Sequence, residues 1–320
     1  MTREATTKVL ALHLGIVVAL FLAQFVLGPY HHSNIARIMV FGAYAIGYNV
    51  LLGYTGLMSL GHAMFFASGL YGAGLTVYYW GFSSVEAFLF GVVATLLFAI
   101  VFGLIVVRTT GVSFLIVTLM FAQAAMLATL YFNRVTRGDE GIVISSQLQP
   151  LEIAGSTLAF SDPSVKYNLA WLLFAVAFIA SLALVRSPIG RIWIAIRENE
   201  ARTRMLGYNT YKYKFLALVI SATIAGAAGA AYALLFSYIG STFASIQYSI
   251  FPLLWTLVGG MGTIIGPLLG TGAMFYLIDI ASGLTESYLF LVGAVLVILI
   301  LWVPKGIMGG IRDRWLPWLP

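Results

Sequence analysis

The chain has 320 residues, of which 61% are hydrophobic and 9% are charged, and its formal net charge is +6. Soluble domains carry roughly 25% charged residues, so this composition excludes a water-soluble globular protein and indicates a polytopic membrane protein. Cysteine is absent from the sequence, which excludes disulfides and thiolate metal sites. The excess of basic residues has an ordinary explanation in membrane topology, so nucleic acid is not an expected partner.

About ten apolar segments follow one another along the chain. A helix that crosses a bilayer needs ~20 apolar residues. The first segment is preceded by Arg3 and Lys8 like a signal peptide, but no small-residue cleavage site follows it, so it is interpreted as a transmembrane helix. The eight longer segments are 8–28, 35–52, 57–80, 87–107, 111–133, 166–185, 213–239 and 286–303, and a shorter pair lies at 250–262 and 266–282. The sequence predicts an all-α membrane protein with one transmembrane domain over residues 1–320.

Small residues within the third and seventh segments indicate where helices approach closely. They are Gly69, Gly72 and Gly74, and then Gly226 and Gly229. We interpret them as packing positions first, within this chain or against a partner.

The stretch 187–214 is too polar to insert into lipid. Ser187-Pro188 is typical of a helix start and Gly207 of a helix stop, so one or two short helices outside the bilayer are expected. A structured basic segment of this kind either lies on lipid headgroups or docks a soluble partner. Taken alone, its residues leave both interpretations open.

The shorter pair of segments is rich in glycine. Segment 250–262 ends in Gly259-Gly260-Met261-Gly262, and Gly266-Pro267 follows. The pattern indicates a half-helix or a sharp break, which at membrane depth must be covered by protein or a watery cavity. A tight turn between two ordinary helices fits the same residues.

The basic residues divide unevenly between the two sides of the membrane. With about ten segments, all 17 except Arg37, Arg134, Arg137 and Lys166 fall on the side of the N-terminus. Because cytoplasmic loops are enriched in Lys and Arg, the sequence predicts cytoplasmic termini, a cytoplasmic stretch 187–214 and a main outer loop over 134–165.

Sites for chemistry are scarce. The sequence has no GxxxxGK followed by Ser or Thr, no HExxH and no GxSxG, so neither an ATPase site nor an intramembrane enzyme is expected. No carboxylate is expected at mid-membrane, which disfavours an ion-coupled secondary carrier. His62 is a candidate for a substrate pathway, but it is expected near a membrane interface, where its polar tip can reach water or a neighbouring carbonyl, and this ordinary explanation is favoured. Gln123 is a further candidate, although hydrogen bonds between helices explain it equally well. Asp139 and Glu140 are candidates for the outer mouth of the pathway.

Several motifs together resemble one family. They are GYTGLMSLGHAMFF (53–66), RTTGVSFLIVTLMFAQ (108–123), the whole run 187–233, LLWTLVGGMGTIIGPLLG (253–270) and WVPKGIMGG (302–310). They are similar to the permease subunit, of the LivM kind, of bacterial ABC importers for branched-chain amino acids. The resemblance implies an inner-membrane protein with four kinds of partner: the lipid bilayer, a second homologous permease, two cytoplasmic ATPases that bind ATP and Mg, and a periplasmic binding protein.

The resemblance also implies that 187–214 is a coupling loop that docks an ATPase. The residues expected to do so are Gly190, Arg191, Arg197, Glu198, Asn199, Glu200, Ala201, Arg204 and Gly207. Two departures stand out. Glu200-Ala201 is followed by Arg202 where ABC permeases commonly have a second alanine, and the periplasmic loop reads Arg137-Gly138-Asp139-Glu140-Gly141-Ile142 where relatives commonly have Gly-Gly-Thr-Asn-Gly-Leu. The second departure leaves urea, short amides and aromatic carboxylates open as substrates.

Overall fold

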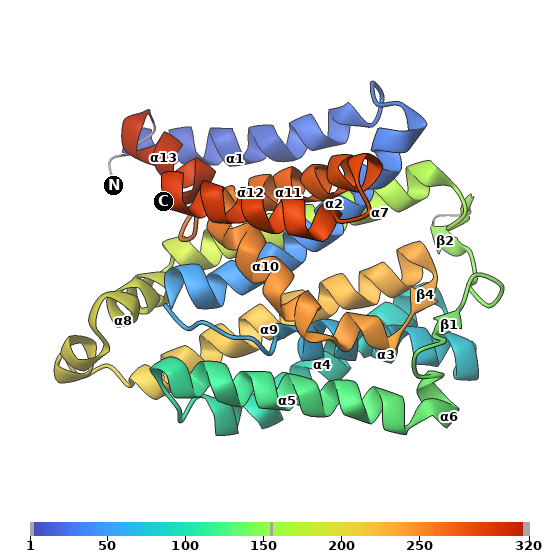
Figure 1. Ribbon diagram of the computed structural model, residues 1–320, viewed down its shortest axis with the longest axis horizontal. Coiled ribbons are helices and arrows are strands. Elements are labelled where there is room, and N and C mark those ends of the chain that lie inside the picture. The colour runs from blue at the N-terminus through green and yellow to red at the C-terminus, as the bar shows by residue number, and fades with distance from the viewer. Residues whose placement is uncertain (1–2, 154–155, 316–320) are drawn as a thin grey trace.

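The computed structural model describes residues 3–153 and 156–315 as a bundle of helices that run mostly along one long axis (Figure 1). Its helices are α1 (Arg3–Ala23), α2 (Pro29–Asn49), α3 (His62–Trp80), α4 (Ser84–Val106), α5 (Gly111–Tyr131), α6 (Asn133–Thr136), α7 (Pro163–Arg186), α8 (Pro188–Met205), α9 (Thr210–Phe236), α10 (Ile246–Gly259), α11 (Gly266–Leu284), α12 (Tyr288–Trp302) and α13 (Gly306–Arg314). The structure is 79% helical, which confirms the prediction of an all-α membrane protein.

Six helices in the described part of the chain are long and apolar enough to cross a membrane. They are α2 together with the turn that follows it, α4, α5, α7, α9 and α11. The apolar stretches of α1, α10 and α12 are shorter, and the 19-residue α3 is diluted by glycine and tyrosine. The count of about ten membrane-spanning segments therefore stays a prediction. The segment expected at residue 57 begins only at His62, because residues 57–61 form a loop.

The other helices of the bundle pack around a central pair, α2 and α9. α2 and α9 lie side by side, α3 and α4 pack on α9, and α10 and α11 pack on α2. α7 covers a further side of α2, and α1 packs on α7. Three of the predicted small residues form the contact between α3 and α9: a Cβ added to Gly69 would overlap the carbonyl group of Gly226, and one added to Gly229 would overlap that of Phe66. Gly72 faces Gly91 of α4, and Gly74 faces Ile239 of β4. These packing positions therefore act within this chain.

Irregular segments follow two of the central helices, α2 and α9. α2 continues into a π-helical turn, η1 (Val50–Tyr54), a distortion often found at functional sites. After α9 the chain forms the short strand β4 (Tyr238–Ile239) and the 3₁₀ helix η2 (Ser241–Ala244) before α10 begins. With 14 residues, α10 spans ~21 Å of the roughly 30 Å of a hydrocarbon core.

The segment expected as the main outer loop has structure of its own at the end of the bundle opposite to α8 (Figure 1). It holds α6 and the strands β1 (Ile142–Val143), β2 (Leu151–Ile153) and β3 (Ser156–Leu158). β2 and β3 form an antiparallel pair, and β1 pairs with β4, with Ile142 opposite Ile239. The outer segment is thus joined to the end of α9.

Candidate functional site

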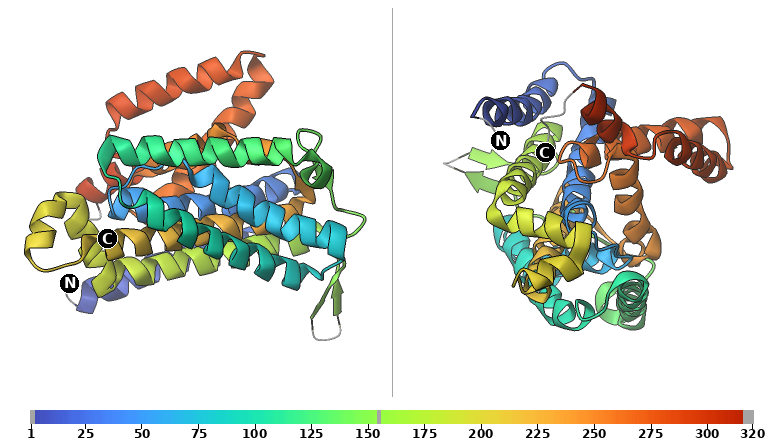
Figure 2. Two further views of the ribbon diagram at one scale, coloured as in Figure 1. Left: turned by 90° about the horizontal axis from the view of Figure 1, so that it is seen from below. Right: turned by 90° about the vertical axis from the view of Figure 1, so that its left-hand side faces the viewer.

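The basic stretch forms α8, which lies at one end of the bundle beyond the other helices (Figures 1 and 2). It begins as the sequence predicts, because the Ser187 hydroxyl accepts a hydrogen bond from the backbone N–H of Gly190 at 3.4 Å and Pro188 occupies the first turn. The helix is broken at Asn199, whose φ of −161° and ψ of 98° are not helical. The Asn199 side chain then accepts a hydrogen bond from the N–H of Arg202 at 2.8 Å and caps the second piece. α8 therefore consists of two short helices.

The first piece is held to the bundle by its apolar side. The Trp193 side chain is fully buried, and its Nε1–H donates a hydrogen bond to the carbonyl oxygen of Tyr213 at 2.9 Å. Ile196 is buried one turn later. Gly190 has no room for a side chain, since a Cβ there would overlap the carbonyl group of Val185. Trp193 and Ile196 are thus already used within the chain.

Arg197, at the end of the first piece, is turned toward the bundle. Its guanidinium donates a hydrogen bond to the carbonyl oxygen of Gly53 in η1. A Cβ at Gly262, in the turn between α10 and α11, would lie 2.9 Å from Nη1 of the same arginine. This contact joins α8 to two other segments that are distant in the sequence.

Glu200, at the start of the second piece, is the centre of a small polar network. Its Oε1 lies 2.9 Å from Lys214 Nζ and 3.1 Å from Arg204 Nη2, and it accepts a hydrogen bond from the Thr210 hydroxyl at 3.0 Å. Burial alone would raise the pKa of the Glu200 carboxyl, but the hydrogen bonds from Lys214 and Thr210 and the positive charges of Lys214 and Arg204 outweigh it. The pKa of Glu200 therefore lies below its ordinary value.

The tip of the second piece is exposed and combines apolar with basic side chains. Met205 is 88% exposed and Leu206 is 72% exposed, and Arg202 and Arg204 beside them are exposed as well. We call Ala201, Arg202, Arg204, Met205 and Leu206 the α8 tip. Sequence reasoning passed over Met205 and Leu206, although two adjacent apolar residues at the end of a polar helix were a signal that could have found them.

The structure separates the residues predicted to dock an ATPase into two groups. Arg191, Glu198, Asn199, Ala201, Arg204 and Gly207 are exposed. Gly190 and Glu200 contact the chain itself through the interactions described above, and so does Arg197, although this residue is also exposed. The docking role of all nine stays a prediction.

His62 lies inside the bundle. The ring is fully buried, and its Nε2 is 2.8 Å from the Ser221 hydroxyl, which donates its own proton to the carbonyl oxygen of Gly47 at 2.6 Å. Because that hydroxyl proton is already used, Nε2 of His62 carries the hydrogen and donates it to Ser221. The histidine thus connects α3 with α9 and α2. Its place on a substrate pathway stays a prediction.

The other pathway candidates lie on α5 and beyond its end. Gln123 is half-buried on α5. Asp139 accepts a hydrogen bond from the Ser241 hydroxyl of η2 at 2.8 Å. Asp139 and Glu140 line an open recess of about 510 Å³ together with Arg134 and Arg137. The structure therefore brings the two acidic residues together and leaves Gln123 apart from them.

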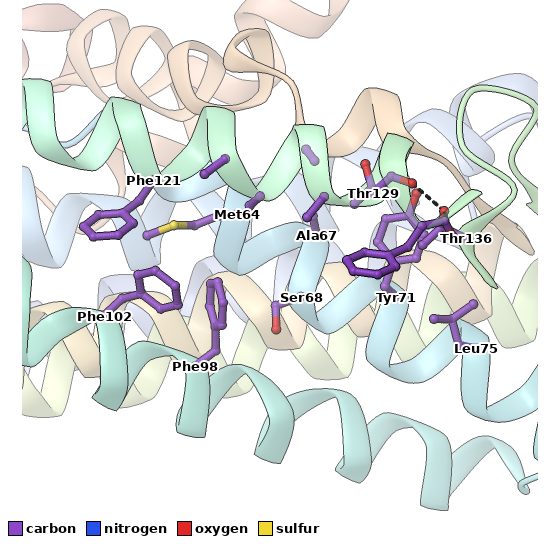
Figure 3. Close-up of a pocket in the computed structure, with 15 residues that line it drawn as sticks. Met64, Ala67, Ser68, Tyr71, Leu75, Phe98, Phe102, Phe121, Thr129 and Thr136 are labelled. Atoms are coloured by element: carbon purple, nitrogen blue, oxygen red, sulfur yellow. Dashed lines mark hydrogen bonds between the residues drawn. The ribbon is translucent and has the colours of Figure 1, made fainter. Parts of the chain in front are cut away.

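A cavity of about 430 Å³ lies between α3, α4 and α5 (Figure 3). Its lining is mostly apolar, with Phe98 and Phe102 from α4, Phe121 from α5 and Met64 from α3, and with Ser68, Tyr71, Thr129 and Thr136 as its polar members. In the described residues, no group of three or more His, Asp or Glu side chains could hold a metal ion.

Comparison with known proteins gives a consistent result. The family model described as the permease component of branched-chain amino acid transport systems matches residues 32–301. The high-affinity branched-chain amino acid transport system permease proteins LivM of Salmonella typhimurium and of Escherichia coli are each 28% identical over 294 residues, which cover 86% of this chain and 69% of theirs. LivH of Salmonella typhimurium is 23% identical over 285 residues, which cover 83% of this chain and 90% of its own.

No solved structure matches the chain. The family match nevertheless covers most of it, including the segments α2 to α11 that build the bundle. The chain therefore belongs to the family of permease components of branched-chain amino acid transport systems.

Proposed function

We propose that this chain is a permease subunit of a binding-protein-dependent ABC importer of branched-chain amino acids, that it forms half of the pathway, and that the α8 tip docks an ATPase. The observation that carries the proposal is the exposed pair Met205 and Leu206 among basic residues on a segment outside the bundle. Fully burying a side chain of this size contributes roughly 1.5–3 kcal/mol. An apolar pair with a basic flank fits a groove with an apolar floor and an acidic rim.

The arrangement of α8 favours docking over binding to lipid headgroups. A helix that lies on a membrane presents one apolar face along its length. In α8 the apolar residues Trp193 and Ile196 already face the bundle, and the free apolar pair sits only at the tip. In Figure 1 α8 lies beyond the other helices at one end of the long axis of the bundle, where it would be accessible to a soluble partner.

We propose that the α8 end is cytoplasmic. The first turn of α1 and the helix α13 lie at the same end of the bundle as α8 (Figure 1). This end also carries the basic residues of α8, while Arg134 and Arg137 follow α5 at the opposite end. The enrichment of cytoplasmic loops in Lys and Arg supports this orientation in a bacterial inner membrane.

The second permease would cover the face that holds η2 and α10. Along the length of the bundle, η2 lies level with the second turn of α3, since the ring of its Phe243 is 6.0 Å from that of Phe66. Irregular backbone at this depth is tolerated only where protein or a watery cavity covers it. α5 and α12 lie on the two sides of α10 (Figures 1 and 2) and would frame such a cavity. Thr242 and Gln247 are exposed on this face.

The mechanism follows from these parts. Closure of the two ATPases around ATP and Mg would move the docked α8 tips toward each other, and the helices attached to α8 would tilt. The cavity between the two permeases would then open to the other side of the membrane. The chain supplies a pathway and a lever, and a periplasmic binding protein would deliver the amino acid.

Reconstitution tests the proposal. The chain is placed in proteoliposomes with a second permease of the family, the ATPases and the binding protein, and uptake of leucine is measured with ATP and, separately, with an ion gradient alone. We expect uptake of leucine only with ATP, and none of urea or benzoate. Uptake by this chain alone on an ion gradient would instead identify a secondary carrier.

A further inference from the structure

We propose that Arg197 is a positioning residue that joins α8 to the ends of two bundle helices, α2 and α10, so that the three segments move together. The inference rests on the proposed function in one respect, the role of α8 as the segment that an ATPase moves. The mechanical connection itself is argued from contacts within this chain.

Two glycines make room for the arginine, and a third lets the two backbones beside it come close together. Gly56 has a φ of +78° and Gly262 a φ of +72°, a backbone conformation that favours glycine. A Cβ at Gly56 would lie 2.8 Å from Cγ of Arg197, and one at Gly262 would lie 2.9 Å from its Nη1. A Cβ at Gly53 would lie 2.6 Å from the backbone nitrogen of Gly262. The motifs GYTG (53–56) and GGMG (259–262) thus place two backbones close together on one guanidinium.

The electrostatics of helix ends favour a cation at this point. The last carbonyl groups of a helix lack partners within the helix and carry the negative end of its dipole. Gly53 belongs to η1, the last turn of the α2 segment, and Gly262 lies just after the end of α10. Two such helix ends therefore meet at Arg197. Its planar guanidinium donates to Gly53 and lies against Gly262. It holds five donors in a wide fixed fork, whereas a lysine ammonium is a compact point charge with three donors.

Asn49 connects the same two helix ends independently of Arg197. Its side chain is 1% exposed, donates a hydrogen bond to the carbonyl oxygen of Thr263 at 2.8 Å and accepts one from the N–H of Gly262 at 3.1 Å. The end of α2 and the turn after α10 are thus already one unit. Arg197 attaches α8 to this unit, whereas the hydrogen bond of Trp193 attaches α8 to α9.

The connection leads to the face proposed for the pathway. α10 carries Gln247 on that face, and the turn after α10 also contacts α13, where a Cβ at Gly260 would lie 2.8 Å from the backbone nitrogen of Gly309. A displacement of α8 would therefore reach α10 through Arg197 without passing through the length of α9.

The first experiment measures the connection in the purified chain, which contains no native cysteine. Spin labels are attached to Arg202→Cys on α8 and Met261→Cys in the turn after α10, both at exposed positions, and the distance distribution between them is recorded. We expect Arg197→Ala to broaden this distribution, Arg197→Lys to broaden it less, and Arg191→Ala, an exposed arginine on the same helix, to leave it unchanged. An unchanged distribution for Arg197→Ala overturns the inference.

The second experiment measures transport in the reconstituted importer. With Arg197→Ala we expect the ATPases to be retained and ATP to be hydrolysed, while leucine uptake per ATP falls about tenfold, in the range of typical coupling energies between sites. Arg197→Lys should recover part of this ratio, and Arg108→Ala, at an exposed position just after the end of α4, should keep it. An unchanged ratio for Arg197→Ala overturns the inference. Absence of ATP-driven uptake in the unsubstituted importer would count against the proposed function instead, and the spin-label result would still decide the connection.

Discussion

Lys214 and Glu200 form an ion pair with 2.9 Å between Nζ and Oε1, and the lysine side chain is only 4% exposed. Lys214 belongs to the first turns of α9, and Glu200 begins the second piece of α8. A buried ammonium group is costly unless a carboxylate or other acceptors compensate it. The pair therefore fixes the α8 tip relative to α9.

Replacing Glu200 with Gln should release the second piece of α8. The amide can accept a hydrogen bond but leaves the charge of Lys214 uncompensated. Breaking a fully buried pair costs about 3–5 kcal/mol. We expect a smaller loss here, because Glu200 is 26% exposed and solvent screens it. Trypsin should then cleave faster after Arg202 and Arg204. Glu198→Gln, a neighbouring exposed position, serves as the control, and equal cleavage of all three proteins would contradict the prediction.

The same pair predicts a pH dependence. The pKa of Glu200 is lower in the folded chain than its ordinary value. Its contribution to stability is therefore fully present above the ordinary carboxyl pKa and is lost as the pH falls through the lowered value. A spin label at Arg202→Cys should stay immobile at neutral pH and become mobile only in acid. In a Glu200→Gln background its mobility should no longer change over that range, and an unchanged acid transition there would assign it to another group.

The substitution Ala201→Trp distinguishes an effect on docking of the ATPase from an effect on folding of this chain. Ala201 is exposed, so the indole should fit within this chain. In a protein groove, however, it would overpack the contact by ~1–3 kcal/mol. We expect normal membrane insertion together with loss of the co-purifying ATPases and of ATP-driven uptake. Ala183→Trp, at an exposed position on α7, should change none of these. Normal uptake with Ala201→Trp would rule out a docked surface at this residue.

Cysteine labelling tests the orientation. A cysteine at Arg202 should react with an impermeant thiol reagent only after the membrane is opened, and one at Ser146 should react in intact spheroplasts. Both positions are exposed. A cysteine at Thr203, which is 3% exposed, should react poorly in either case and controls for access. Labelling of Arg202→Cys and Ser146→Cys from the same side would show that the number of crossings between them is even.

Gly69→Ala should weaken the contact between α3 and α9. The added methyl group would overlap the backbone of Gly226, and separating the helices to admit it should cost ~1–3 kcal/mol. We expect a lower unfolding temperature in detergent. Gly15→Ala on α1 is the matched control, since a Cβ there meets nothing within 4 Å and alanine favours a helix by about 1 kcal/mol over glycine. Equal temperatures for the two variants would show that α3 and α9 can move apart freely.

Local signals predicted the outline of α8 well. Ser187-Pro188 and Gly207 mark its ends because a cap, a proline and a glycine act on the nearest turn of backbone. The apolar segments were found for a similar reason, since length and hydropathy are local properties. The orientation of Arg197 and Glu200 could not be found in this way. The partners of Arg197, Gly53 and Gly262, lie far away in the sequence, and the break at Asn199 turns the second piece of α8, which carries Glu200, out of line with the first.

Depth in the bundle was the other property that the sequence did not reveal. His62 opens an apolar segment and was expected near a membrane interface. After the loop 57–61, His62 instead lies in the interior of the bundle. There its ring is hydrogen-bonded to Ser221, which in turn donates to the carbonyl oxygen of Gly47. No periodicity within one segment predicts which two other helices will surround a residue.

The position of α2 at the centre of the bundle has a consequence for biosynthesis. Its neighbours α7, α9, α10 and α11 all come later in the chain, and Asn49 is separated from its partner Thr263 by 214 residues. At about 5–20 residues per second, the ribosome needs on the order of ten to forty seconds to supply that partner. During this interval the Asn49 amide in α2 lacks its hydrogen-bond partner Thr263. The nascent chain therefore depends on other protein groups or on water near the site of membrane insertion to satisfy this amide.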